Sequence, residues 1–222
     1  MTAKALPYVA VLTGDIVDST KRPDKAHPRD LSRTLREAAK AAAAAIPAAG
    51  LSTLDIFRGD SWQLLVKEPS HALRAALYVR TYIRGGEARG RISWDTRIAI
   101  GIGPVEWLDP NKISRSQGAA FVASGEALDG LVKSKRRMAM RVAGGGGSPG
   151  LEAVVALLDA LAGQWTAKQA WAIHGALAAR TQAEIARSFV PPVTQQTVAA
   201  HLDKANWDAL EIAFEAWDSG IA

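Results

Sequence analysis

The sequence of 222 residues contains no cysteine, which excludes disulfide bonds, thiolate catalysis and zinc sites built from cysteine. Its four histidines, at positions 27, 71, 174 and 201, are widely separated and lack the spacing of a metal site. No apolar run approaches the roughly 20 residues that a membrane-spanning helix needs. The sequence also shows no basic segment followed by an apolar core near its start, so we expect no signal peptide and a cytoplasmic location.

What remains is the composition of an ordinary globular protein, with 48% hydrophobic and 22% charged residues. The length suffices for one domain of roughly 140 residues and a second, smaller one. The formal net charge of +5 is compatible with binding of nucleotides or nucleic acid but does not establish it.

The most informative feature is a pair of aspartates, Asp15 and Asp60, each of which follows a glycine at the end of an apolar run. Such a run predicts a buried strand that carries a carboxylate at its tip. Two carboxylates on neighbouring strands can hold one or two divalent cations, as phosphoryl-transfer sites require. The alternative is that both are turn residues, because Gly-Asp is common in turns.

The hydrophobic periodicity of residues 1–143 alternates between strand and helix patterns. It predicts strands at residues 6–13, 51–57, 61–67, 96–102 and 137–143, and helices at residues 29–48, 69–83 and 119–131. This order predicts an α+β domain, a ferredoxin-like palm with helices on one face of an antiparallel sheet. The glycine-rich segment 144–150 predicts a linker, because it carries almost no packing side chains.

Residues 151–222 have the pattern of a small all-α domain. Capping-box sequences at Thr166 and Thr181 predict helix starts. A short helix at residues 182–189, a turn at Pro191 and Pro192, and a second helix at residues 195–205 predict a helix-turn-helix.

Four features of residues 6–143 are the motifs GDIVDST and RGDSWQLLV, a strand that ends in Gly101-Ile102-Gly103, and a helix that begins after Gly118. In the order and spacing of these features, residues 6–143 resemble class III nucleotidyl cyclases. The combination with a C-terminal helix-turn-helix is similar to the SatD family of small bacterial proteins. The resemblance implies a site for Mg²⁺ or Mn²⁺ formed by Asp15, Asp60 and the carbonyl of Ile16.

The same resemblance implies a nucleotide-binding set, which comprises Ser19, Thr20, Arg58 and Gly59. The chain departs from the cyclase pattern at three positions. The base-selecting lysine corresponds to Ile56, and the catalytic asparagine and arginine correspond to Val122 and Glu126. A glutamate where the transition state needs a cation is repulsive, so activity is uncertain. The basic residues at 133–137 either supply a substitute cation or form a solvated loop.

The C-terminal pair of helices resembles bacterial regulators of the sigma-region and LuxR-like type. This implies that the second helix reads DNA through residues that include Gln195, Gln196, Thr197, Ala199, Ala200, His201 and Lys204. Arg180 and Arg187 are candidates for phosphate contacts. The alternative is a helical bundle that mediates dimerisation, because the second helix has only one lysine and the last helix is acidic.

Taken together, these patterns predict a SatD-like regulator in which a nucleotide and a divalent metal bind the palm domain and the helix-turn-helix binds DNA or a partner. The alternative is an active metal-dependent nucleotidyl cyclase or nucleotidyltransferase. A third interpretation makes both domains interaction modules and the aspartate pair a remnant. We expect a homodimer, because cyclase-type palms build their sites between two subunits.

Overall fold

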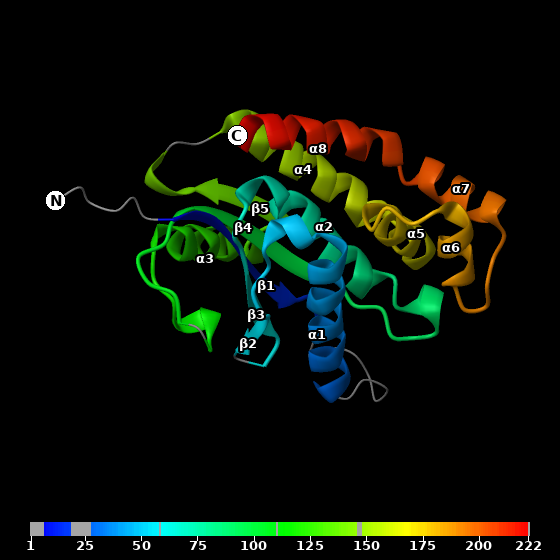
Figure 1. Ribbon diagram of the computed structural model, residues 1–222, viewed down its shortest axis with the longest axis horizontal. Helices are drawn as coiled ribbons and strands as arrows, with labels where there is room; N and C mark the ends of the chain where they lie inside the picture. Colours follow the sequence, from blue (N-terminus) through cyan, green and yellow to red (C-terminus); the bar gives the residue numbers. More distant parts are fainter. Residues whose placement is uncertain (1–6, 19–27, 58, 110, 146–147, 222) are drawn as a thin grey trace.

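The computed structural model describes residues 7–18, 28–57, 59–109, 111–145 and 148–221 (Figure 1). Its centre is a five-stranded sheet with the strand order β2-β3-β1-β4-β5. The strands are β1 (Tyr8–Ile16), β2 (Asp55–Phe57), β3 (Ser61–Val66), β4 (Thr96–Pro104) and β5 (Met138–Val142). The α+β class predicted from the sequence is therefore confirmed.

The sheet is mixed, so the predicted all-antiparallel sheet is wrong at one edge. β1 pairs antiparallel with both β3 and β4, and β2 pairs antiparallel with β3. β5 instead runs parallel to β4. The physical reason is the helix α3 (Ala119–Val132), which carries the chain back along the sheet between these two strands.

Helices cover both faces of the sheet, which corrects the expectation that they cover one. The helices α1 (Pro28–Ala45) and α2 (Ala72–Arg84) pack on the face that Leu12, Leu64 and Ile100 present to the main core. On the opposite face, Val9 and Val11 form a smaller core with Ala120 of α3. Because successive residues of a strand point to opposite faces, an apolar residue at nearly every position of β1 is what two covered faces require.

The approach of α3 to β4 depends on Gly101. A Cβ atom at this position would lie 2.3 Å from both the Ala120 carbonyl oxygen and the Ser124 amide nitrogen. The helix can therefore lie directly on the strand only because no side chain stands between them. Ser124 uses this closeness, and its Oγ lies 2.7 Å from the Thr13 Oγ1 of β1.

Five helices follow the glycine-rich segment: α4 (Pro149–Gln164), α5 (Ala167–Leu177), α6 (Gln182–Arg187), α7 (Gln195–Lys204) and α8 (Trp207–Ile221). Figure 1 shows α4, α5 and α8 beyond α2, on the side of the sheet away from α3. Val155 of α4, Ile173 of α5 and Trp217 of α8 belong to the same hydrophobic core as the sheet. The division into domains at residues 144–150 stays a prediction, and in the folded chain the two parts share one core.

None of the helices in the described ranges is long and apolar enough to cross a lipid bilayer.

Candidate functional site

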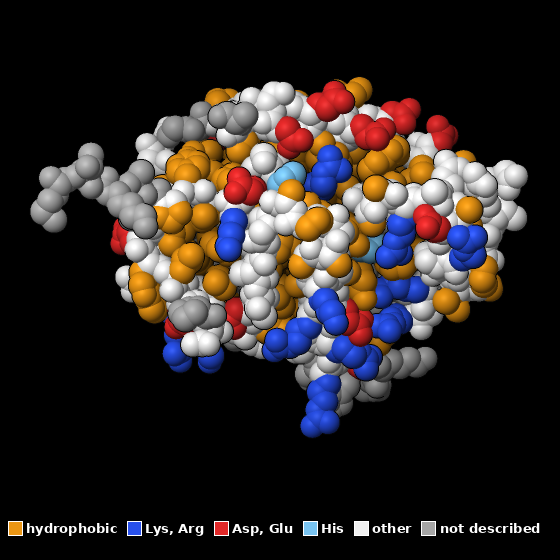
Figure 2. Space-filling view, viewed as in Figure 1, with side chains coloured by type: hydrophobic (Ala, Val, Ile, Leu, Met, Phe, Trp, Pro, Cys, Tyr) orange, Lys and Arg blue, Asp and Glu red, His pale blue; other side chains and the backbone are white. Residues whose placement is uncertain are grey.

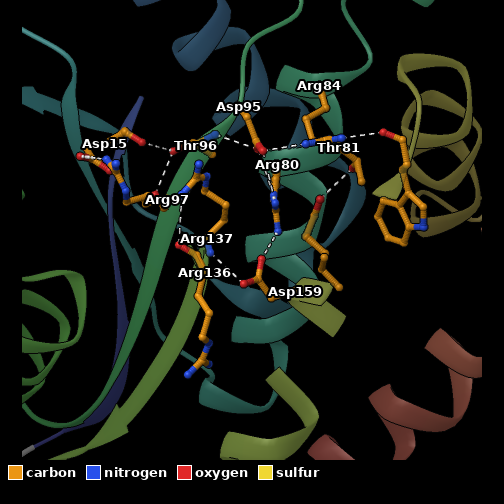
Figure 3. Close-up of polar contacts among 12 residues, drawn as sticks. Asp15, Arg80, Thr81, Arg84, Asp95, Thr96, Arg97, Arg136, Arg137 and Asp159 are labelled. Atoms are coloured by element: carbon orange, nitrogen blue, oxygen red, sulfur yellow. Dashed lines mark hydrogen bonds and ion pairs between the residues drawn. The ribbon is translucent and has the colours of Figure 1, made fainter. Parts of the chain in front are cut away.

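Asp15 lies near the end of β1, opposite Ser61 of β3 and Arg97 of β4. Its Oδ2 accepts a hydrogen bond from Arg97 Nη1 at 2.8 Å, which makes an ion pair (Figure 3). Its Oδ1 is buried and has no hydrogen-bond partner among the described residues. A buried carboxylate oxygen without a donor is unfavourable and rare in folded proteins, so Oδ1 is a candidate ligand atom.

The electrostatic surroundings of Asp15 favour its protonated form. Burial raises the pKa of its carboxyl above the ordinary value, the charge of Asp60 raises it further, and Arg97 and Arg137 act in the opposite direction. The net result is a raised pKa. The effect of Asp60 shows that the two predicted metal carboxylates lie close enough to interact.

The other predicted site residues are only partly described. Asp60 follows the β2–β3 turn, in which Gly59 has a φ of +85° that favours glycine. Ile16 has its side chain in the core, so only its backbone is available to the site. The remaining predicted nucleotide-binding residues, which are Ser19, Thr20 and Arg58, lie outside the described residues.

Two arginines balance the two carboxylates. Arg97 bonds to Asp15 directly, and the half-buried Arg137 acts on it through its charge. The four formal charges cancel, so a bare divalent cation would leave the site with excess positive charge. The negative charge of a polyphosphate that arrives with the cation would offset this excess, which favours binding of the two together.

The backbone of Asp15 is held by Thr96 and Trp62. Trp62 Nε1 donates to Thr96 Oγ1 at 3.1 Å, and Thr96 Oγ1 lies 2.8 Å from the Asp15 carbonyl oxygen, to which it can donate. Gly14 makes room for the indole, because a Cβ atom there would lie 2.5 Å from two atoms of the Trp62 ring. Trp62 is fully buried in the core, so it supports the strand end from behind.

Behind the strand end lies a buried ion network centred on Arg80 of α2 (Figure 3). Arg80 donates from Nε to Asp95 at 3.0 Å and from Nη1 to Asp159 of α4 at 2.7 Å. Arg84 joins it, donating 2.6 Å bonds to Asp95 and to the Trp165 carbonyl oxygen. The network ties α2, the start of β4 and α4 together.

This network reaches the candidate site by two routes. Asp95 accepts a hydrogen bond from the amide of Thr96, and Thr96 contacts the Asp15 carbonyl. Asp159 accepts one from the amide of Arg137 at 2.7 Å. Burial by itself would raise the pKa of Asp95, but the neighbouring guanidinium groups outweigh it and lower the pKa.

Sequence reasoning did not find these supporting residues. Arg80 is completely buried within a run of apolar helix positions, and only its charge in that setting distinguishes it. Its partners Asp95 and Asp159 come from a loop and from a distant helix, so no local pattern connects them.

Two of the three positions where the chain departs from the cyclase pattern lie on the outer side of α3. Val122 is exposed. Glu126 is exposed and forms an ion pair with Arg141 of β5. The acidic charge of Glu126 is therefore balanced by a neighbour on the adjacent strand.

The predicted helix-turn-helix residues fall on α6, α7 and the turn between them. Both predicted capping boxes are present: the side chains of Thr166 and Gln169 cap α5, and those of Thr181 and Glu184 cap α6. Ile185 and Val198 are buried and hold α6 and α7 in the core.

The residues predicted to contact DNA are divided by the fold. Gln195, Gln196, Ala200 and Lys204 have exposed side chains, whereas Thr197 and Ala199 are partly buried. His201 is also partly buried, and its ring stacks on Phe189 with centroids 6.0 Å apart. Burial lowers the pKa of His201. The role of all these residues in DNA binding stays a prediction.

The donor set fits a metal ion only as part of a larger complex. The described residues contain no group of three or more His, Cys, Asp or Glu side chains placed to hold one. Two carboxylates and a backbone carbonyl are hard oxygen donors of the kind that Mg²⁺ and Mn²⁺ accept. The unpartnered Oδ1 of Asp15 is the acceptor that a cation would satisfy. Further ligands would come from phosphate oxygens and water.

The sequence matches no protein-family model and none of the curated proteins. Several solved structures are similar to part of the chain. One is the catalytic core of a rhodopsin-guanylyl cyclase with converted specificity, in complex with ATPαS. It is 21% identical in sequence, the match covers 58% of this chain and 76% of the cyclase chain, and the TM-score is 0.43. A bacterial light-regulated adenylyl cyclase is 14% identical, with coverages of 62% and 77% and a TM-score of 0.42.

The guanylate cyclase domain of RhGC from Catenaria anguillulae, in complex with GTP, is 20% identical, with coverages of 57% and 75% and a TM-score of 0.42. These identities and scores are too low to assign the chain to a family.

Proposed function

We propose that the sheet and its helices bind a nucleotide together with Mg²⁺ or Mn²⁺, and that the α6–α7 pair binds DNA or a partner, as in a SatD-like regulator. The observation that carries the nucleotide site is the buried, unpartnered Oδ1 of Asp15, next to Asp60 and two arginines. The motif resemblance of residues 6–143 to nucleotidyl cyclases supports the same proposal.

In this proposal, Asp15, Asp60 and the Ile16 carbonyl hold the cation, which supplies positive charge to the polyphosphate. Arg97 orients Asp15 through its ion pair. Ser19, Thr20, Arg58 and Gly59 contact the phosphates.

Two observations favour binding over turnover. The position of the family's catalytic arginine is Glu126, and the nearest cation, Arg141, is already bonded to it. The position of the catalytic asparagine is Val122, whose side chain cannot hydrogen-bond. A missing transition-state donor commonly costs a hundredfold or more in rate, about 3 to 4 kcal/mol. We therefore expect a sensor of the nucleotide, acting as a homodimer.

The test is to measure thermal stabilisation by ATP, GTP, CTP and UTP, each with and without Mn²⁺, and to resolve any products by chromatography. We expect one nucleotide to stabilise the chain only when Mn²⁺ is present, and Asp60→Ala to abolish the effect. Asp218→Ala, an exposed acid on α8, is the matched control and should behave as the wild type. Stabilisation that persists in Asp60→Ala would refute the site, and a cyclic product lost in that variant would establish the enzyme instead.

The raised pKa of Asp15 predicts how this binding depends on pH. A protonated carboxyl is a poor metal ligand, so affinity should fall as the pH is lowered through that pKa. Because the pKa is raised, the fall should begin at a higher pH than an ordinary aspartate would give.

A further inference from the structure

A basic strip runs along one side of the molecule. Arg29, Arg33, Arg36 and Lys40 repeat at helical spacing on α1, so they share one face of that helix. The strip continues through Arg91 to residues 180–187, where Arg180 and Arg187 complete it, and all seven side chains are exposed. Figure 2 shows Lys and Arg side chains gathered over α1 and towards α6, on the lower right of the view.

Three acidic residues within the strip are engaged in local contacts. Asp30 bonds to Arg33, and Glu37 bonds to Arg91 and to the Tyr82 hydroxyl. Glu184 is held in the capping box of α6. The acidic surface lies elsewhere, on α8, which carries four acids and no base: Asp208, Glu211, Glu215 and Asp218. The strip and α8 therefore differ in the sign of their charge.

The strip is attached to the predicted helix-turn-helix by direct contacts. The amide of Val190, in the turn between α6 and α7, donates to the Ala88 carbonyl at 2.8 Å. Arg89 holds the loop that carries Arg91 through cation–π contacts. Its guanidinium lies 3.9 Å from the ring centroid of Tyr82 and 4.8 Å from the ring centroid of Trp171. The loop that carries Arg91 is thus packed against the α6–α7 turn.

The strip has the positive charge that α7 lacks for binding to DNA. The exposed face of α7 carries Gln195, Gln196 and Ala200, with Lys204 as its only lysine or arginine. Amide side chains can read base edges, but tight binding to duplex DNA depends on neutralising phosphates. The strip lies next to the motif and has the charge that α7 lacks.

We propose that the basic strip binds the phosphate backbone of duplex DNA while the α6–α7 pair lies against the groove. The proposal rests on the DNA-binding part of the proposed function and names the residues that supply the affinity. It is independent of the nucleotide site.

The experiment measures binding of a fluorescein-labelled DNA duplex of mixed sequence to the full chain by anisotropy, over a series of salt concentrations. The test variant is Arg36→Gln with Lys40→Gln, and the matched control is Lys112→Gln with Arg115→Gln, two exposed bases in the segment between β4 and α3. Each phosphate contact contributes about 0.9 to the slope of log K against log salt. We expect the strip variant to lower that slope by about 2 and the control to leave it unchanged.

Three other results would overturn the proposal. Equal losses in the two variants would show a general effect of net charge and would leave DNA binding by α6–α7 standing. Absence of duplex binding by the wild type at low salt would remove the DNA-binding function as well. If sedimentation shows that the strip variant loses self-association while duplex binding is unchanged, the strip pairs with the acidic α8 of a second copy instead.

Discussion

At the scale of single residues, the charged side chains of Arg80 and Asp15 differ in how fully they are paired. Arg80 is fully buried, and hydrogen bonds to two carboxylates satisfy its guanidinium, as a structural charge requires. Asp15 has one oxygen paired with Arg97, and the other has no partner among the described residues. This contrast supports the proposal that Asp15 has a functional role and Arg80 a structural one.

Gly14→Ala tests the packing behind Asp15. The added methyl group would lie 2.5 Å from the Trp62 ring and 2.6 Å from the Arg97 carbonyl oxygen, and neither can move freely. We expect unfolding by urea to show a loss of about 1 to 3 kcal/mol. The matched control is Gly125→Ala in α3, where nothing lies within 4 Å of the new atom. That change should stabilise the chain by up to about 1 kcal/mol, because alanine favours helix.

His174 should make the protein sensitive to acid. Its ring is buried, stacks on Trp171 with centroids 4.7 Å apart, and has a pKa lowered to about 3 by burial. The folded state therefore keeps His174 neutral while the unfolded chain takes up a proton near pH 6.5. Stability from this residue is complete above pH 6.5 and is lost as the pH falls, by about 2 kcal/mol at pH 5.

The measurement is the free energy of unfolding of wild type and His174→Phe at pH 8 and pH 5. The phenylalanine ring keeps the stack and cannot titrate, so the difference between the two pH values should shrink by about 2 kcal/mol in the variant. An unchanged difference would show that other groups cause the acid sensitivity.

At the scale of elements, local sequence patterns predicted the features that depend on neighbouring residues, namely helix starts and the approximate ranges of helices and strands. The capping sequences at Thr166 and Thr181 mark true helix starts, because the cap is formed within three residues. Helices and strands were found close to their observed ranges for the same reason. The parallel pairing of β5 and the position of α3 on the second face were missed, since alternation of residues does not state which strand pairs with which.

The candidate site was predictable only in part. Asp15 and Asp60 stand beside glycines at the ends of apolar runs, and that local pattern identified them. Arg97, Thr96 and Trp62, which hold Asp15, are 47 to 82 residues away from it in the sequence, and only the sheet register brings them together. Their contribution follows from tertiary structure and has no sequence signal.

Thr181→Ala should destabilise α6 and the turn that follows it. The Thr181 side chain accepts a hydrogen bond from the Glu184 amide, and the Glu184 carboxylate accepts one from the Thr181 amide at 2.8 Å. Removal of the hydroxyl leaves the amide of the first turn without its cap, at a cost of about 1 kcal/mol in urea unfolding. Thr53→Ala, an exposed threonine in a loop, serves as the control and should change stability by less than about 0.5 kcal/mol. Equal losses in both variants would contradict the capping role.

At the scale of the whole molecule, the helices after the glycine-rich segment complete the core of the sheet domain. Tyr78 of α2 packs on His174 of α5, with ring centroids 4.1 Å apart. Trp217 of α8 is fully buried and donates to the Pro69 carbonyl at 3.3 Å. The predicted nucleotide site and the α6–α7 pair therefore belong to one packed body, and a flexible linker is not needed to connect them.

We expect this body to unfold in a single transition. Calorimetric and van't Hoff enthalpies should agree, whereas two independent domains joined by a linker would give two transitions.

The variant Asp159→Ala provides a second test, because it leaves Arg80 buried with one partner fewer and removes the acceptor of the Arg137 amide. Breaking a buried ion pair costs about 3 to 5 kcal/mol, which for a chain of this length lowers the melting temperature by roughly 10 °C. If the core is shared, the one transition shifts as a whole, and hydrogen exchange accelerates in β4 and in α4 together. A shift confined to one of two transitions, with β4 protection unchanged, would show that residues 151–222 fold separately and that the sheet domain is stable without them.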